Sequence, residues 1–410
     1  MPQSESGSLG ALAIRDFRIL FLGTLAAFTA FFTSTVILGV VAFELTGSNA
    51  AVGTAVFGQG LGMVLCGPLG GAFADRLPKR RVIAVCQMIA ATTFGALGVL
   101  YALDRLVLGH LVANSFAFGC AFGFLGPARQ ALVVDLVPPE RIGNAMALSN
   151  VANTISRVAG PVVAGLLLDW EAAGPAAAYG VMSFLYASSS VSLLWLPKSK
   201  VRPTAAEKHV LHDLVDGLRY AWRAPRLRIL LAFFVGVMLI GFPHVTLIPG
   251  LLENQLGRPS QDVTRYALAS AVGAFATAIS VARFADSPRA TRIYSAMAMA
   301  FGLALTALAA APTFGTGVAA MVLVGASSGG FHALNGAVVA RETEPAYMGR
   351  VLSLTFLAFA AFSLSALPLG LLADAFGERI VLSGMGLAVF AVAGFMSWRL
   401  SHARSIREVA

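Results

Sequence analysis

The sequence predicts an all-α membrane protein, with twelve transmembrane helices in two pseudo-symmetric six-helix bundles. Three observations support this prediction: an apolar composition, evenly spaced apolar runs and an internal repeat. Of the 410 residues, 57% are hydrophobic and 12% are charged, whereas an ordinary soluble domain has about 25% charged residues. A chain of this length suits about a dozen bilayer spans of roughly 20 to 25 residues each, with short loops.

Twelve apolar runs, separated by short polar turns, are the expected spans. The first run, about residues 19–43, is too long for the apolar core of a signal peptide. The rest of the first half has runs at about 50–74, 82–103, 106–136 and 142–168, and a last run that ends near residue 196. The second half has runs near 227–250, 262–285, 290–311, 314–340, 347–373 and 380–400.

The segment between the two sets of runs is the one long polar connection. Its apolar residues recur at helical spacing, at Val210, Leu211, Leu214, Val215, Leu218 and Trp222. This pattern predicts an amphipathic helix on the cytoplasmic membrane surface, or one packed on the ends of the spans. We therefore expect an N-terminal half at 1–196, a cytoplasmic linker at 197–225 and a C-terminal half at 226–410.

Short pieces of the first half recur in the second half in the same order and at nearly the same separation. Residues 73–75 match 284–286, Pro139 and Gly143 match Pro345 and Gly349, and residues 165–167 match 370–372. Each match is weak by itself. Together they favour two homologous six-span halves, an arrangement known in transporters.

The net charge of +9 indicates orientation rather than a nucleic-acid partner. With a cytoplasmic N-terminus, most of the 29 Lys and Arg residues lie on the cytoplasmic side of the twelve-span topology. The exceptions are Arg157, inside a span, and Arg105, Arg258, Arg265 and Arg379, outside. We expect a multi-pass protein of a bacterial cytoplasmic (inner) membrane, with both termini cytoplasmic and acting as a monomer.

The side chains give no support for an enzyme. Cys66, Cys86 and Cys120 lie in apolar runs without metal-ligand spacing or a disulfide framework. Paired carboxylates, nucleophile motifs and phosphate loops are also missing from the sequence. The expected partners are a small-molecule substrate and the lipid bilayer, with no metal and no cofactor.

A basic turn between the second and third runs carries a recognisable motif. Residues 70–81, GGAFADRLPKRR, place four cations and one carboxylate between two membrane-length segments. The motif resembles the loop between helices 2 and 3 of the major facilitator superfamily, although Pro78 stands where that family usually has glycine. Residues 126–131, GPARQA, with Asn153, Arg157 and Gly160-Pro161, resemble the branch of siderophore exporters of the enterobactin type, macrolide-efflux-like proteins and the lysophospholipid transporter.

The resemblance implies a conformational latch on the cytoplasmic side. Asp75 would cap the helix that starts the eleventh span, near residues 346–350, because a helix N-terminus attracts a carboxylate. Arg76 and nearby basic residues such as Lys79 would pair with Asp135. The second half keeps Asp286 in a degenerate loop, so the latch is expected to be asymmetric. The alternative is that these charges only orient the protein.

Two features of the fifth span are candidate functional elements. Gly160 and Pro161 permit a bend, with Gly165 one turn later, and the resemblance implies a gate at this position. A purely structural kink is the alternative, and Ser156 stands where the fullest form of the motif has glycine. Arg157 lies roughly 22 Å into the span, so it should face the protein interior or a cavity. It either attracts an anion or takes part in coupling, or it only holds the span by hydrogen bonds.

Other intramembrane polar and aromatic residues are candidates for the substrate cavity or for coupling. They are Gln59, Asn114, Asn153, His332 and Asn335, together with Phe28 as an aromatic wall. His332 is the histidine best suited to titrate, although structural hydrogen bonding is the alternative. All 20 carboxylates lie at span ends or in loops, so the usual mid-membrane proton carrier is missing.

The sequence therefore leads to two functional hypotheses. The first is a secondary active exporter of an amphipathic organic compound, a siderophore or a drug, that is driven by the proton gradient and works by alternating access. The second is a lysophospholipid transporter, or flippase, of the inner membrane. A membrane scaffold or sensor would need a soluble effector domain, and the sequence has no segment that suits one.

Overall fold

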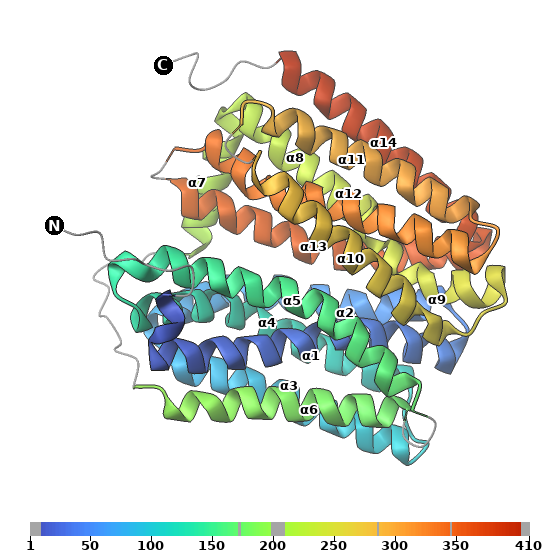
Figure 1. Cartoon of the computed structure of the whole chain (residues 1–410), viewed down its shortest axis with the longest axis horizontal. Coiled ribbons are helices and arrows are strands. Elements are labelled where there is room, and N and C mark those ends of the chain that lie inside the picture. The colour runs from blue at the N-terminus through green and yellow to red at the C-terminus, as the bar shows by residue number, and fades with distance from the viewer. Residues whose placement is uncertain (1–9, 171–173, 198–209, 285–286, 345–346, 403–410) are drawn as a thin grey trace. The chain divides into compact units, whose positions relative to one another are not determined.

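The structure is a computed structural model that describes residues 10–170, 174–197, 210–284, 287–344 and 347–402. Every regular element in these ranges is a helix (Figure 1). Within the described helices, the side chains of residues 68–76 and 210–214 lie outside the description. The same is true of scattered side chains between 349 and 361.

Six long helices form the first half of the chain. They are α1 (Arg15–Thr46), α2 (Asn49–Arg76), α3 (Lys79–Ala102), α4 (Leu108–Leu136), α5 (Ile142–Leu168) and α6 (Gly174–Ser192). Single turns of 3₁₀-helix precede α1 at Gly10–Ala13, precede α5 at Pro139–Arg141 and follow α6 at Leu193–Trp195. Pro138 and Pro139 explain the break before α5, because a proline has no N–H to continue a helix.

The second half begins with a short helix and a broken span. The short helix is α7 (Val210–Arg223), and it exposes the apolar side chains of Val215, Leu218 and Trp222. The seventh span starts as α8 (Pro225–Ile240) and then changes to a 3₁₀ segment at Phe242–Leu247, α9 (Ile248–Gly250) and a π-turn at Leu251–Gln255. The remaining helices are α10 (Val263–Ala282), α11 (Ala290–Ala310), α12 (Phe314–Arg341), α13 (Met348–Phe376) and α14 (Glu378–His402).

Most of the long helices are apolar enough to cross a membrane. Ten segments of the described chain meet this condition by length and composition. Helices α10 and α13, with 20 and 29 residues, fall on the two remaining predicted spans, 262–285 and 347–373. The predicted fold class is therefore confirmed.

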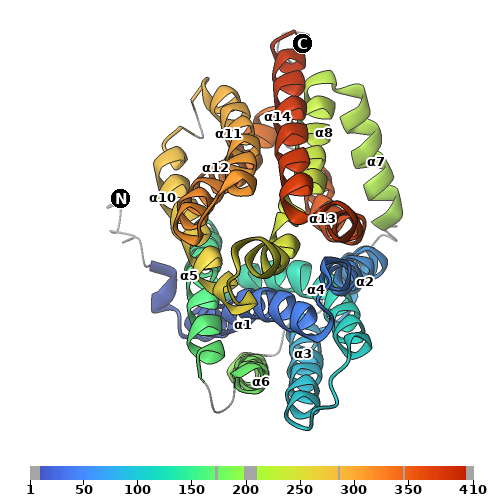
Figure 2. The same cartoon turned by 90° about the vertical axis from the view of Figure 1, so that its right-hand side faces the viewer.

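Contacts between helices divide the chain into two compact units. Unit 1 comprises Met1–Ile37 and Gly62–Val210, and unit 2 comprises Leu38–Leu61 and Leu211–Ala410. The last part of α1 and the first part of α2 therefore belong with unit 2. Inside the units, α3 packs on α4 and α6, and α11 packs on α12 and α14 (Figure 2). In the predicted repeat, α11 of the second half is the counterpart of α3 of the first half. The matching contacts of α3 and α11 therefore support two related halves.

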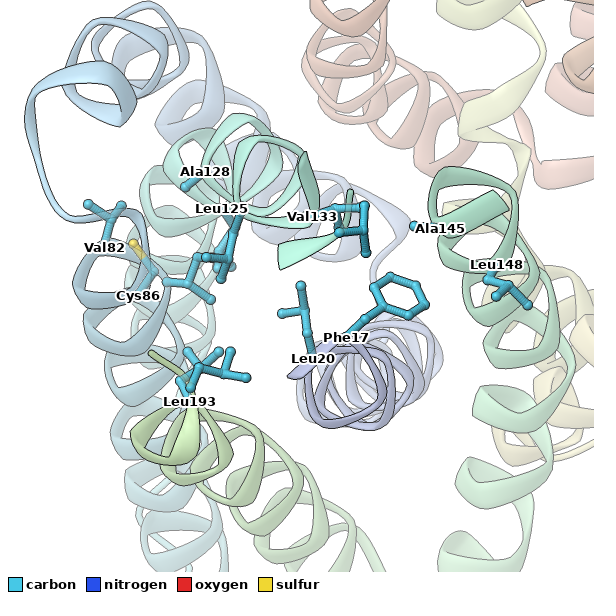
Figure 3. Packing of buried hydrophobic residues seen from close by; sticks show 14 of the residues in the cluster. Phe17, Leu20, Val82, Cys86, Leu125, Ala128, Val133, Ala145, Leu148 and Leu193 are labelled. Atoms are coloured by element: carbon cyan, nitrogen blue, oxygen red, sulfur yellow. The ribbon is translucent and has the colours of Figure 1, made fainter. Parts of the chain in front are cut away.

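The core of unit 1 is apolar at the end of the helices that carries the basic turn. Phe17 and Leu20 of α1 point toward Leu125 and Val133 of α4 (Figure 3). Val82 and Cys86 of α3 and Leu193 after α6 close the same cluster (Figure 3). This packing fixes α1 and α4 against each other.

A group of aromatic rings packs together in the interior of unit 2. The ring of Phe331 in α12 stacks on Tyr294 of α11 at 4.5 Å between centroids and on Phe234 of α8 at 5.8 Å. Phe233 meets Tyr294 edge-on at 5.2 Å. Aromatic pairs at these separations stabilise the fold by more than the burial of their apolar surface alone. They therefore hold α8, α11 and α12 together as one group.

Candidate functional site

The joint between α1 and α5 is close because Gly160 has no side chain. A Cβ atom at this position would collide with Phe32 and lie 2.9 Å from the backbone nitrogen of Thr33. The Thr33 hydroxyl donates to the Gly160 carbonyl at 3.2 Å, and the Ser156 hydroxyl donates to the Leu25 carbonyl at 3.2 Å. Small residues and hydroxyls of this kind are typical of close helix contacts in membranes.

Pro161 changes the backbone of α5 at the same level. It lies inside the helix and is buried, and its missing N–H removes the hydrogen bond to the carbonyl of Arg157. Gly165 lies one turn later, and its carbonyl accepts from the backbone N–H of Asp169 at 2.9 Å. The predicted gate residues thus lie on the helix that carries Arg157, and their role as a gate stays a prediction.

Arg157 lies on the polar side of α5, half a turn from the exposed apolar side. The apolar side consists of Val151, Ile155, Val162 and Leu166, which are 38% to 71% exposed. At about 100° per residue, Asn153 and Arg157 fall roughly opposite this stripe. The guanidinium of Arg157 lies over the ring of Phe32, 5.5 Å from its centroid.

A second guanidinium comes from α4. Arg129 lies over the ring of Phe28, 4.9 Å from its centroid, and its Nε atom is buried without a hydrogen-bond partner among the described residues. Phe28 and Phe32 are one helical turn apart and near the middle of α1 (Arg15–Thr46), so they present their rings on one face. Sequence reasoning placed Arg129 only within a family motif, although a cation inside an apolar run was the available signal.

Neither guanidinium is paired with a carboxylate of the described residues. A single arginine at the centre of a membrane helix costs roughly 2.5 to 3.5 kcal/mol on insertion scales. Cation–π contact offsets part of this cost, by about 0.5 to 2 kcal/mol for each ring. The two guanidiniums, which lie over rings on neighbouring turns of α1, thus form a region of positive charge inside unit 1.

Aromatic rings lie next to this positive region. Phe31, on the same part of α1, stacks on Phe118 and Phe122 of α4 at 6.0 Å and 5.2 Å. Phe94 of α3 and Tyr186 of α6 extend the stack, with ring centroids 5.8 Å apart. The combination of cations with an aromatic wall suits an amphipathic molecule.

On the predicted cytoplasmic side, Lys79 and Asp135 form an ion pair with Nζ and Oδ2 2.6 Å apart. Asp75 and Arg76 end α2, but their side chains lie outside the described residues, as does all of Asp286. The latch that these three residues would form therefore stays a prediction. Arg341 instead donates to the carbonyl of Ser287, which ties α12 to the turn before α11.

The other predicted cavity residues are distributed over both units. Asn114 of α4 is buried, with its Oδ1 atom unpartnered among the described residues, and Asn153 is half-buried on α5. In unit 2, Gln59 is half-buried on α2. Asn335 accepts from the Tyr294 hydroxyl at 3.1 Å, and His332 lies 6.2 Å from the ring of Phe234. Asn335 therefore has a structural hydrogen bond in the group of aromatic rings of unit 2.

A carboxylate network at the α1–α2 turn was missed by sequence reasoning. Asp374 of α13 accepts from the Ser48 hydroxyl at 2.5 Å and from the backbone N–H groups of Asn49 and Ala50 at 2.8 Å and 3.0 Å. Glu378 is 2% exposed and accepts from Asn49 at 2.9 Å. Asn254 and Gln255 donate to the same carboxylate at 2.7 Å and 3.1 Å.

The break in the seventh span was also missed. The backbone leaves the α-helix at Gly241, and buried His244 turns its Nδ1 atom to the Gly241 carbonyl at 2.8 Å. Gly241 and Pro243 were the available sequence signal, because neither favours a continuous helix. Broken spans of this kind line binding sites in many transporters.

Comparison with known proteins identifies the family. The family model of the Major Facilitator Superfamily matches residues 20–366. The chain belongs to this superfamily. This confirms the family that the sequence motifs predicted. The protein is a multi-pass membrane transporter.

Similar proteins include efflux proteins. The chain is 23% identical to macrolide efflux protein A of Streptococcus pyogenes over 341 residues, which cover 82% of this chain and 83% of that protein. It is 27% identical to the enterobactin exporter EntS of Shigella flexneri over 337 residues, with 80% and 78% covered. These bacterial relatives place this superfamily member in the inner membrane.

Solved structures agree on the fold. The nucleoside transporter NupG matches with a TM-score of 0.73 at 16% identity, covering 95% of this chain and 99% of that chain. A bacterial homologue of the human lysosomal transporter Spinster matches with a TM-score of 0.73 at 14% identity, covering 94% and 96%. At these identities the comparison concerns the fold alone.

Proposed function

We propose that the protein is a proton-coupled exporter of an amphipathic organic compound, a siderophore or a drug, that works by alternating access. The observation that carries this proposal is the α1–α5 joint, where Gly160 and Pro161 adjoin two arginines and an aromatic wall. A close contact next to a broken hydrogen bond lets α5 bend where a substrate would lie. The efflux proteins among the relatives support the outward direction.

Proton coupling would use groups at the ends of the helices. Among the residues that the structure describes, no carboxylate lies at the middle of a predicted span. Asp135, Asp16, Glu44 and a histidine such as His332 are the remaining candidates. Coupling through one of them makes export depend on the proton gradient.

The test compares the small molecules released by cells that produce the intact protein with those released by cells that produce Gly160→Val, with and without a protonophore. A discrete compound enriched outside only with the intact protein and an intact gradient supports the proposal. Export that persists after the gradient collapses contradicts the coupling. Gly143→Val is the matched control, because a side chain on Gly143 of the same helix meets open space.

The second candidate function is transport of a lysophospholipid. The unpaired guanidiniums of unit 1 favour this function, because the phosphate of a lysophospholipid is an anion that guanidinium groups bind. It predicts an altered lysophospholipid content of the membrane, with no compound enriched in the medium.

A further inference from the structure

The two guanidiniums of unit 1 have features of a binding site rather than of a structural brace. A structural arginine inside a membrane protein pairs with a carboxylate or with backbone carbonyls. No described residue gives Arg129 or Arg157 an ion pair. The guanidinium of each lies over a phenylalanine ring, and that of Arg129 also interacts electrostatically with Tyr186. The Nε atom of Arg129 is buried and unpartnered within the described part of the chain. The folded protein thus keeps a positively charged side chain with a hydrogen-bond donor that no described residue uses.

The spacing of the two groups suits one ligand. Phe28 and Phe32 are four residues apart on α1, so their rings lie on adjacent turns of the same face. Arg129 covers the first ring and Arg157 the second. Guanidiniums present planar donor pairs that match a carboxylate, a sulfonate or a phosphate.

The surroundings indicate what the rest of the ligand is made of. Phe31, Phe118 and Phe122 form a stacked group on α1 and α4, and Phe31 is the immediate neighbour of Phe32. Rings of this kind hold an apolar or aromatic body by stacking. The same cations repel a protonated amine, because like charges in a low-dielectric region are strongly unfavourable.

We propose that Arg129 and Arg157 jointly bind the anionic group of the transported compound, which is an aromatic organic anion, and that they exclude organic cations. This inference rests on the proposed function and names its substrate class. It makes Arg129 a binding residue and assigns to Arg157 the anion-attracting role. It also separates this chain from any relative that carries a cationic compound.

The experiment measures binding to the purified full-length protein in lipid nanodiscs by calorimetry. Three probes share one ring system and differ in charge: 2-naphthoate, 2-naphthalenemethanol and 2-naphthylmethylammonium. Intact protein is expected to bind the anion and to discriminate against the cation. Arg129→Gln and Arg157→Gln are each expected to weaken naphthoate binding by about tenfold or more, and to leave the neutral probe unchanged. Arg105→Gln, an exposed position between α3 and α4, is the matched control.

A second variant separates binding from folding. Arg129→Met removes an unpaired charge and keeps an apolar side chain of similar length, so the ligand-free protein should melt at a higher temperature. Naphthoate should then no longer raise that temperature. If Arg129 is instead a structural brace, Arg129→Met melts lower and all three probes lose affinity together, which overturns the proposal. Equal binding of the three probes by the intact protein overturns it as well.

A lipid source of the anion is tested in the same way. Lysophosphatidylglycerol binding that depends on both arginines, and that exceeds naphthoate binding, overturns the aromatic substrate class and moves the anion site to a lipid phosphate. The tests of this binding site and of the exporter function can fail independently of each other. Charge-selective binding without export from cells leaves this site in place and removes the proposed function, whereas export of neutral and cationic compounds removes this site and leaves the function.

Discussion

At the scale of single residues, Gly160 determines how close α1 and α5 lie. Its hydrogen atom occupies the position where a methyl group would collide with Phe32. The contact also orders the Thr33 hydroxyl, which donates to the Gly160 carbonyl. Arg157 lies less than one turn before Gly160, so the approach of the two helices sets the position of its guanidinium.

We predict that Gly160→Ala destabilises the protein and reduces export. Overpacking a close contact costs typically 1 to 3 kcal/mol, which exceeds the gain of up to about 1 kcal/mol from replacing glycine in a helix. The melting temperature of the purified protein should therefore fall. Gly143→Ala on the same helix meets open space and should melt at the same or a slightly higher temperature. Equal melting of the two variants would contradict the argument.

The sequence predicts some residues of the site better than others. Arg157 was predicted because a cation in the middle of an apolar run is conspicuous. Arg129 was not predicted as a site residue. It lies seven residues before the end of α4 (Leu108–Leu136) and was interpreted only as part of a family motif. Its contact with Phe28 depends on the packing of α1 against α4, which residue spacing along either helix does not determine.

At the scale of elements, the first turn of α2 is completed by another helix. The backbone N–H groups at a helix start have no partner within the helix. In α2, those of Asn49 and Ala50 are satisfied by Asp374 of α13. A carboxylate at this end also interacts favourably with the helix dipole. The α1–α2 turn is therefore attached to the end of α13.

We predict that Asp374→Ala destabilises this attachment. Loss of a helix cap costs about 0.5 to 2 kcal/mol, and the Ser48 hydroxyl loses its acceptor as well. The effect should appear as faster amide hydrogen exchange in residues 48–51 than in the intact protein. Asp169→Ala, an exposed carboxylate at the end of α5, is the control and should leave that exchange unchanged. Unaltered exchange in Asp374→Ala would show that the cap contributes no stability.

These element-level contacts were beyond sequence reasoning for a physical reason. Asp374 and Asn49 are separated by 325 residues, and a carboxylate at a span end has many possible partners. The lengths and order of the helices followed from the apolar runs, because a bilayer fixes the length of a span. The break in the seventh span was not predicted, because its apolar run continues past Gly241 and Pro243, and these two residues are the only local signal of a break.

At the scale of the whole molecule, composition and repeat were enough to predict the fold class. Each span must satisfy its own backbone groups in the bilayer, so an apolar chain of this kind folds as helices. The family followed from the basic turn and the GPARQA motif. The substrate site did not follow, because members of one fold differ in the side chains that line their cavities.

We predict that both termini face the cytoplasm. The excess of Lys and Arg in the loops on that side of the predicted topology sets this orientation. Green fluorescent protein fused to either end should fluoresce, and alkaline phosphatase fused to either end should be inactive. A phosphatase fused after Gly47, in the α1–α2 turn, should be active and serves as the control. Active phosphatase at either terminus would reverse the topology.

The cap on α2 also has a consequence for how the protein is made. The ribosome synthesises Asn49 long before Asp374, and the first turn of α2 therefore waits for its acceptor during most of translation. Assembly of the α1–α2 turn is thus completed only after the eleventh span has entered the membrane. A chain truncated before α13 should keep this turn open to proteases that the finished protein resists.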